Sequence, residues 1–220
     1  MRAKREPPPK EKGQRKNEIT DRHTGTYYIH ANFVKCLLSL TAHLDEEKVN
    51  YTVNLVTNTL VYTARERLVG QAINDGFSHV LWIDADMIFE PEMFDDLLDV
   101  GKPIVTGRFV CRRQPFVPCQ FTDIDEIQRC EEYPLNPFRI DGTGLAFTLV
   151  TADALRAVFK QYGTCFTPLP GLGEDIAFCK RCKEMGIEIW CEPTVQVGHI
   201  SHIPIYPGDD YDFMRRITQC

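Results

Sequence analysis

The sequence lacks any apolar stretch long enough to cross a membrane. A membrane-spanning helix needs about 20 consecutive apolar residues, and the apolar run "FVKCLLSL" (33–40) is short and interrupted by Lys35. The chain begins "MRAKREPPPK", which has none of the apolar core of a secretory signal peptide. These absences argue against a membrane-spanning or secreted protein. We expect a soluble, cytoplasmic one.

The sequence also lacks internal repeats and a second CxxC motif. Its nine cysteines are irregularly spaced, and "CKRC" (179–182) is the single CxxC pair. Zinc sites of the ribbon type use two such pairs, and this pair lies in a helical pattern. Reduced cysteines in the core are therefore favoured for Cys179 and Cys182 over half of a zinc site.

Charge is unevenly distributed along the 220 residues. Residues 1–16 hold seven Lys/Arg and two Glu, a balance of +5, and the remaining 18 basic and 29 acidic residues give −11. The first 16 residues have no apolar periodicity and contain a proline triplet, so we expect a disordered cationic arm. The arm is either a solvated tail or a contact for a polyanion such as nucleic acid. The acidic remainder, 17–220, suits a single folded domain.

The apolar pattern alternates between strand and helix signals. This order predicts an α/β fold, with a mostly parallel sheet covered by helices and an irregular or hairpin insert at about 107–141. The predicted helices are 31–44, 63–75, one opened by Pro91 and ended by Gly101 with Leu98 on its inner face, 152–161 and 174–185. The predicted strands are 17–20, 51–57, 79–84, 102–109, 142–150 and 187–193.

The stretch "HVLWIDADMIF" (79–89) carries a buried strand directly into Asp84 and Asp86. In parallel α/β sheets, ligands bind beyond the carboxyl ends of the strands, and a spacing of two residues aims both carboxylates the same way. Two close carboxylates repel each other unless a cation lies between them. Mg²⁺ and Mn²⁺ bind carboxylates together with phosphate oxygens. The alternative is a turn or a helix N-cap that uses aspartate.

Two other segments carry groups that suit catalysis. Glu174 and Asp175 begin a helix behind a glycine-rich loop; they either complement the helix dipole or provide a general base. His199, in "VGHISH" (197–202), is either a structural hydrogen-bonding group or an imidazole ligand for a cation, with His202 as a rival for that role.

Two arginines begin the predicted helix at 63–75. Arg65 and Arg67 lie in "YTARERLV" (62–69). They are either solvent-exposed surface, or groups that orient a diphosphate or the aspartate pair.

Taken together in their order, these segments resemble the GT-A glycosyltransferases, and more narrowly the small family 2-like glycosyltransferases of phage and bacterial genomes. The resemblance covers roughly residues 60–200, and more loosely 24–60. The matching stretches are "ARERLVGQAINDGFSHVLWIDADMIFEPE", "GKPIVTGRFVCRRQPFVP", "DGTGLAF", "GEDIAFCKRCKEMGIEIWCEP" and "VGH".

This resemblance implies a GT-A (Rossmann-like) fold, a nucleotide-sugar donor and a divalent cation, Mn²⁺ or Mg²⁺. The DxD motif Asp84-Ala85-Asp86 would hold the metal and reach the donor's ribose and diphosphate. The metal would neutralise charge on the departing nucleoside diphosphate. Of the pair Glu174-Asp175, Asp175 would be the base of an inverting displacement.

The resemblance assigns the remaining residues to ligands as well. His199 would be a third metal ligand. Arg65, from its place at a helix start, is expected to bind the donor. The glycines of "DGTG", Gly142 and Gly144, would line the sugar and acceptor pocket, where the backbone can approach substrate closely. Thr24, in "RHTGT" (22–26), would contact the nucleoside.

Two other classes of protein share features with this sequence. A nucleotidyltransferase shares paired carboxylates but needs a basic, glycine-rich phosphate loop near the N-terminus, and the sequence has none. A catalytically silent nucleotide-sugar-binding module of the same fold is favoured by the short, polar first strand. The acceptor is open between a sugar, a lipid-linked sugar, a protein and a modified nucleobase in DNA.

Overall fold

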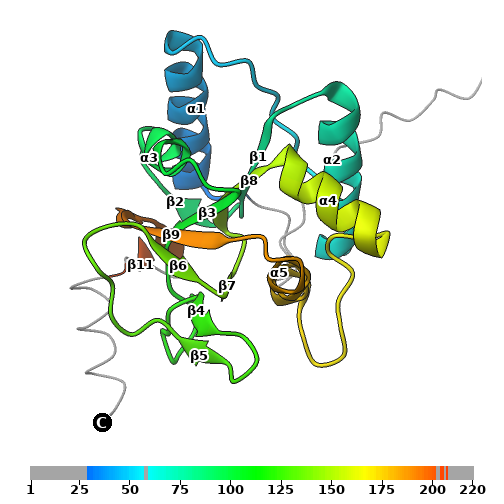
Figure 1. Cartoon of the computed structure of the whole chain (residues 1–220). Helices are drawn as coiled ribbons and strands as arrows, with labels where there is room; N and C mark the ends of the chain where they lie inside the picture. Colours follow the sequence, from blue (N-terminus) through cyan, green and yellow to red (C-terminus); the bar gives the residue numbers. More distant parts are fainter. Residues whose placement is uncertain (1–28, 57–58, 202–203, 206, 208–220) are drawn as a thin grey trace, which may run out of the picture.

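A computed structural model describes residues 29–56, 59–201, 204–205 and 207 (Figure 1). The predicted cationic arm at 1–16, the strand at 17–20, Thr24 and His202 lie outside the described residues. No described helix is both long and apolar enough to cross a membrane.

A five-stranded mixed sheet forms the centre of the described structure, in the order β1-β8-β3-β9-β6. Of its four neighbouring pairs, β3–β9 is parallel and the other three are antiparallel. The mixed α/β class is confirmed, but the expectation of a mostly parallel sheet is wrong. The strand before β8 in the chain, Gly142–Thr143, belongs to a smaller sheet, and a short link joins the two. No described helix crosses over to β8, and β8 runs antiparallel to β1 and β3. The strands are β1 His79–Ile83, β3 Ile104–Arg108, β6 Phe138–Ile140, β8 Phe147–Thr151 and β9 Ile189–Gln196.

Five described helices cover the two faces of this sheet (Figure 1). Helices α1 and α3 contribute to one apolar cluster, and α2, α4 and α5 contribute to the other. Neighbouring strand residues alternate between the clusters, since Ile104 belongs to one and Val105 to the other, as the pleat of a strand requires. The helices are α1 Ala31–Glu46, α2 Val61–Asp75, α3 Met93–Asp99, α4 Ala152–Tyr162 and α5 Glu174–Glu184.

Local sequence signals explain where these helices begin and end. The Thr151 hydroxyl accepts a hydrogen bond from the Ala154 N–H at the start of α4, a standard N-cap. Gly76 and Gly163 end α2 and α4 with φ of 77° and 72°, the left-handed conformation that glycine adopts without strain. The five predicted helices are confirmed. Leu98, which we expected on the inner face of α3, is instead 38% exposed.

The strand predicted at 51–57 is wrong for its described part, because residues 51–56 form no strand. An alternating pattern becomes a strand only where a neighbouring edge supplies hydrogen bonds, and the described pairing of the edge strand β1 is with β8. Val53 and Leu55 are therefore about half exposed, at 45% and 55%. The segment instead lines a cavity of about 260 Å³ together with α1, α2 and β1.

In the described part of the chain, two smaller three-stranded sheets lie beside the central one, in the orders β5-β4-β7 and β11-β10-β2. The second of these pairs β10 with β2, with His199 opposite Met87, and so joins the C-terminal part of the described chain to the segment that follows β1. The strands are β2 Met87–Ile88, β4 Gln120–Asp123, β5 Gln128–Arg129, β7 Gly142–Thr143, β10 Gly198–Ile200 and β11 Pro204–Ile205.

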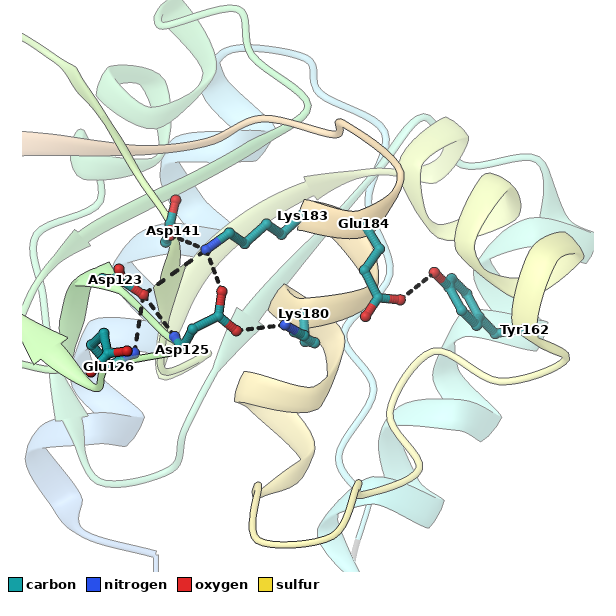
Figure 2. A network of polar contacts seen from close by, with 8 residues as sticks. All are labelled: Asp123, Asp125, Glu126, Asp141, Tyr162, Lys180, Lys183 and Glu184. Carbon is teal, nitrogen blue, oxygen red and sulfur yellow. Dashed lines mark hydrogen bonds and ion pairs between the residues drawn. The ribbon is translucent and has the colours of Figure 1, made fainter.

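A polar network ties α5 to the sheet that contains β4 and β7 (Figure 2). Lys183 lies 2.8 Å from Asp125 and 2.6 Å from Asp141, and Lys180 also contacts Asp125. At the far side of α5, the Tyr162 hydroxyl donates a 2.8 Å hydrogen bond to Glu184. These contacts hold the helix against both neighbours, so its N-terminus lies in a defined position beside β7.

Candidate functional site

The two aspartates of the DxD motif lie in a tight turn at the carboxyl end of β1. The Asp84 N–H donates to the Ala146 carbonyl at 2.9 Å, and the Met87 N–H donates back to the Asp84 carbonyl at 3.2 Å. The chain then enters β2 and packs Met87 in the core. The turn therefore holds both carboxylates at the point where the chain leaves the central sheet. Ala85 is exposed at its tip.

Asp86 lies beside His199, which comes from a strand far along the sequence. The register of β2 and β10 sets His199 opposite Met87, and His199 Nε2 lies 3.3 Å from Asp86 Oδ2. The second ring nitrogen, Nδ1, lies 2.7 Å from the Val110 carbonyl oxygen. A carbonyl only accepts hydrogen bonds, so Nδ1 carries a proton and donates it. The imidazole is thereby oriented with Nε2 toward the carboxylate.

Arg112 also contacts Asp86 Oδ2, through Nη1. Arg112 is not among the site residues predicted from the sequence. The available signal was its place in "CRRQP", directly after a buried strand. Its partner lies 26 residues earlier in the chain, and no local pattern connects the two.

Arg65 lies on the other side of the turn, between two carboxylates. Its guanidinium nitrogens are 3.4 Å from Asp84 Oδ1 and 3.3 Å from Glu174 Oε1. The guanidinium carbon lies about 6 Å from the Trp82 and Phe166 ring centroids, within the range of cation–π attraction. With only 7% of its surface exposed, Arg65 is not the surface residue of the alternative interpretation. Arg67, two residues on, is exposed.

The pKa values in the turn are shifted in opposite directions. Burial raises the pKa of Asp84, although Arg65 opposes the shift and about half of the side chain is exposed. Burial would also raise the pKa of Asp86, but the hydrogen bond and charge of His199, with the charge of Arg112, lower it. Asp86 is therefore the more firmly ionised of the two. Burial opposes protonation of His199, yet its contact with Asp86 outweighs burial and raises the pKa.

Asp175 begins α5 close to Gly144. Burial raises the pKa of Asp175, and the hydrogen bond from the Ile176 N–H to Oδ1, 2.8 Å long, opposes the shift. A methyl group at Gly144 would lie 3.7 Å from Asp175 Oδ2, so the backbone of Gly144 lies close to this oxygen. A carboxylate with a raised pKa is a stronger proton acceptor than an ordinary one.

Gly142 lies in a different environment from Gly144. It is buried, and a methyl group there would come within 2.5 Å of an Ile124 methyl carbon. Its lack of a side chain serves close packing. The structure thus brings Arg65 to Asp84 and Glu174, and His199 to Asp86, through direct contacts. It places Asp175 beside Gly144 and leaves Gly142 in the core.

Asp86 and His199 supply part of the ligand set that a divalent cation needs. Among the described residues, no three His, Cys, Asp or Glu side chains gather closely enough to hold a metal by themselves. Asp86 and His199 do converge, and the Nδ1 hydrogen bond to a backbone carbonyl is the support that metal-binding histidines usually have. Mg²⁺ commonly uses one or two carboxylates and takes its other ligands from water and substrate phosphates. The pair therefore suits a cation that binds together with a diphosphate.

Cys179 and Cys182 are fully buried in the core. Burial raises the pKa of Cys179 to about 12, which disfavours the thiolate that binds zinc. The interpretation of the "CKRC" pair as core cysteines is confirmed.

The fold and site together define a mixed α/β protein with paired carboxylates, an imidazole and two arginines beyond the end of the edge strand β1. No protein-family model matches the sequence. The chain is 26% identical over 204 residues to the mannan polymerase complex subunit MNN9 of Candida albicans, a match that covers 73% of this chain and 54% of that protein. The chain thus spans about half the length of this curated relative.

A solved structure shares the fold. The chain is similar to A197 from STIV with a TM-score of 0.52 at 16% sequence identity, over 74% of this chain and 79% of that one. At this identity the likeness concerns the fold alone.

Proposed function

We propose that this protein is a metal-dependent glycosyltransferase that moves a sugar from a nucleotide-sugar donor to an acceptor hydroxyl. The observation that carries the proposal is the convergence of Asp86 and His199 at the carboxyl end of β1, in the same turn as Asp84, with Asp175 on a neighbouring helix. The distant similarity to a mannan polymerase subunit supports the same class. We also propose a GT-A arrangement, since β1, β3 and β9 run in one direction and β8 in the other.

Donor binding follows from the charges around the turn. Asp86 and His199 would hold Mn²⁺ or Mg²⁺, which when bound neutralises charge on the departing diphosphate. Arg65 contacts both Asp84 and Glu174 from a buried position. Glu174 therefore acts as a positioning residue, which holds the Arg65 guanidinium beside Asp84. Arg112 lies at the edge of the site, where its guanidinium can bind phosphate oxygens in bidentate fashion.

Asp175 is the proposed general base. Its Oδ1 is engaged by the Ile176 N–H, and Oδ2 is the oxygen nearest to Gly144. Oδ2 would accept the proton of the acceptor hydroxyl as its oxygen attacks the anomeric carbon of the sugar. Attack from the side opposite the leaving nucleoside diphosphate inverts the configuration at that carbon.

The choice of substrates to test first follows from the relative. Mannan is a polymer of mannose, so we propose nucleotide-activated mannose as the first donor and a saccharide as the first acceptor to be tested. A lipid-linked sugar, a protein and a modified nucleobase in DNA are the further acceptor classes for the same assay.

The deciding experiment is a screen of common nucleotide sugars for donor hydrolysis and transfer, with Mn²⁺ and with Mg²⁺. Asp86→Asn and Asp175→Asn should each lower the rate by about 10²–10⁴-fold without unfolding the protein, as expected for loss of a metal ligand or a general base. Asp153→Asn is the matched control, since that side chain is 91% exposed on α4. Full activity in Asp175→Asn would refute the base assignment. Donor binding without turnover in the unaltered protein would favour a silent binding module.

A further inference from the structure

Two thiols lie side by side on the hairpin formed by residues 109–119, which carries Arg112. Cys111 Sγ and Cys119 Sγ are 3.5 Å apart. The Val110–Pro118 bridge and the hydrogen bond from the Cys111 N–H to the Val117 carbonyl pair the two arms of the hairpin. Cys111 is thus opposite Val117, and Cys119 is two residues further along the same arm. Residues two apart share a face of a strand, so both thiols project to one side.

These thiols differ from most other cysteines of the described structure in being accessible. Both are partly exposed, and Cys36 on α1 is the remaining described cysteine of this kind, since the other five are buried. The hydrogen bond with Cys119 and the positive charges of Arg129 and His199 outweigh burial and lower the pKa of Cys111 to about 6. The same contact and burial raise the pKa of Cys119. Cys111 is therefore the nucleophilic partner at neutral pH.

The hairpin also makes three backbone or side-chain contacts to the functional site. Arg112, next to Cys111, contacts Asp86. The Val110 carbonyl, on the other side of Cys111, accepts the hydrogen bond of His199 Nδ1. The Cys119 carbonyl accepts a 2.9 Å hydrogen bond from the Gly144 N–H. The hairpin next to each sulfur is thus in direct contact with groups that line the site.

We propose that Cys111 and Cys119 are a redox-modification site, oxidised reversibly to a disulfide that displaces Arg112 from Asp86. The oxidant is a low-molecular-weight disulfide such as oxidised glutathione. The Cys111 thiolate attacks one of its sulfurs, forming a mixed disulfide and releasing one thiolate. The Cys119 sulfur, on losing its proton, attacks Cys111 Sγ and releases the second thiolate. Two protein thiols lose two electrons and two protons in total, and one disulfide is reduced to two thiols.

The geometry requires a local movement of the hairpin. A disulfide bond is about 2.0 Å long, so the sulfurs must approach by about 1.5 Å. Because the two cysteines are diagonal neighbours on opposite arms, closing the bond shifts one arm along the other. Arg112 follows Cys111 directly, so its guanidinium moves with the hairpin. Asp86 does not move with it, because backbone hydrogen bonds next to β2 hold this residue in place.

Peptide mapping tests the modification itself. The reduced full-length protein is treated with oxidised glutathione, its remaining thiols are blocked with iodoacetamide, and tryptic peptides are analysed by mass spectrometry. The expected product joins peptide 109–112 to peptide 114–129, and it disappears after reduction. Cys119→Ser should retain glutathione on peptide 109–112, and Cys111→Ser should leave residue 119 free for iodoacetamide. Cys36→Ser is the control and should form the linked peptide as before.

The rate comparison makes the result decisive. Cys111 should react about tenfold faster than Cys36, because the hydrogen bond with Cys119 and the nearby positive charges favour its thiolate. Recovery of peptide 109–112 blocked only by iodoacetamide, after Cys36 has been modified, would overturn the proposal. So would a glutathione adduct on residue 119 of Cys111→Ser, formed at the rate of the wild-type reaction.

Mn²⁺ binding by calorimetry tests the link to the site, and this arm rests on the proposed function. Loss of the guanidinium from Asp86 removes a competing cation, so oxidation should tighten Mn²⁺ binding severalfold. The Arg112→Gln protein should bind equally in both redox states. Equal binding by the reduced and oxidised wild-type protein would refute the link. No Mn²⁺ binding in either state counts against the proposed function, and the peptide map still decides whether the disulfide forms.

Discussion

Two arginines balance the carboxylates of the turn, one buried and one at the rim. Arg65 contacts Asp84 and Glu174 from a position that is 7% exposed, and Arg112 contacts Asp86 with 20% of its side chain exposed. Two like charges so close are tolerable only with such partners. The contacts of the two arginines therefore affect both the stability of the turn and the negative charge that is available to bind a cation.

Replacement of Arg65 tests this balance. Arg65→Met should lower the free energy of unfolding by about 1–3 kcal/mol, since it leaves Asp84 and Glu174 without a partner, and their partial exposure reduces the cost below that of a fully buried pair. Urea denaturation at neutral pH measures the change. Arg67→Ala, on the exposed face of the same helix, should change the value by less than about 0.5 kcal/mol. Equal stability of the Arg65→Met and wild-type proteins would contradict this account.

Single residues of the site were predictable where the chemistry is local. Asp84, Asp86 and the Glu174-Asp175 pair stand out because carboxylates interrupt an apolar strand or begin a helix behind glycine. Arg112 was not predicted, because its contact with Asp86 depends on how a distant hairpin folds back. Gly142 and Gly144 have the same local sequence signal, and only their neighbours, Ile124 for one and Asp175 for the other, distinguish them.

Contacts between helices and strands place the remaining groups in the site. The β2–β10 register brings His199 to Asp86. The network of Figure 2 holds α5 against the sheet of β4 and β7. Asp175 lies at the N-terminal end of the same helix. The position of the proposed base thus depends on contacts at the opposite end of α5.

The network on α5 should stabilise the fold at neutral pH and lose this contribution at acidic pH. Hydrogen bonds from Lys180 and Lys183 lower the pKa of Asp125 to about 2, below its ordinary value of about 3.9. A lowered pKa stabilises the fold above the unfolded-state value, and this contribution is lost as pH falls from about 4 to about 2. Urea midpoints of the wild-type protein should therefore fall more steeply over this range than those of Lys180→Ala/Lys183→Ala.

The control for this experiment is Lys160→Ala, an exposed lysine on α4. It should follow the wild-type pH profile. Parallel profiles for the wild-type and double-variant proteins between pH 4 and 2 would show that the network contributes nothing to stability, as many exposed ion pairs do.

Elements were predicted well where periodicity is long and poorly where pairing decides. All five helices were expected, since apolar spacing of three and four residues and glycine stops are local signals. The direction of β8 and the irregular course of 51–56 were not, because strand identity requires a partner. The predicted boundaries of the insert at 107–141 stay a prediction.

The whole molecule places the site at one edge of a sheet that is packed on both faces. Helices α1 and α3 close one face, and α2, α4 and α5 close the other (Figure 1). Because the strands are packed in this way, the turn after β1 is held in a fixed position relative to the sheet. A ligand that bridges Asp86, His199 and the arginines would therefore stabilise the entire fold.

Ligand binding should raise the thermal unfolding midpoint. Mn²⁺ together with a nucleoside diphosphate, at about 100 times its dissociation constant, should stabilise the protein by about 2.7 kcal/mol, because the ligand binds the folded state alone. Differential scanning calorimetry measures the shift, and EDTA should reverse it. Asp86→Asn should abolish most of the effect. An equal shift in this variant would place the ligand elsewhere on the protein.

The sequence by itself determined the helices, the strand that ends in Asp84, and the types of group that suit a cation and a diphosphate, because these depend on residue periodicity and side-chain chemistry. The tertiary structure alone decided which groups meet. It brought His199 and Arg112 to Asp86, buried Arg65, left Gly142 in the core and set the two thiols together. The physical reason is that such contacts arise from strand register and helix packing, which depend on the whole chain.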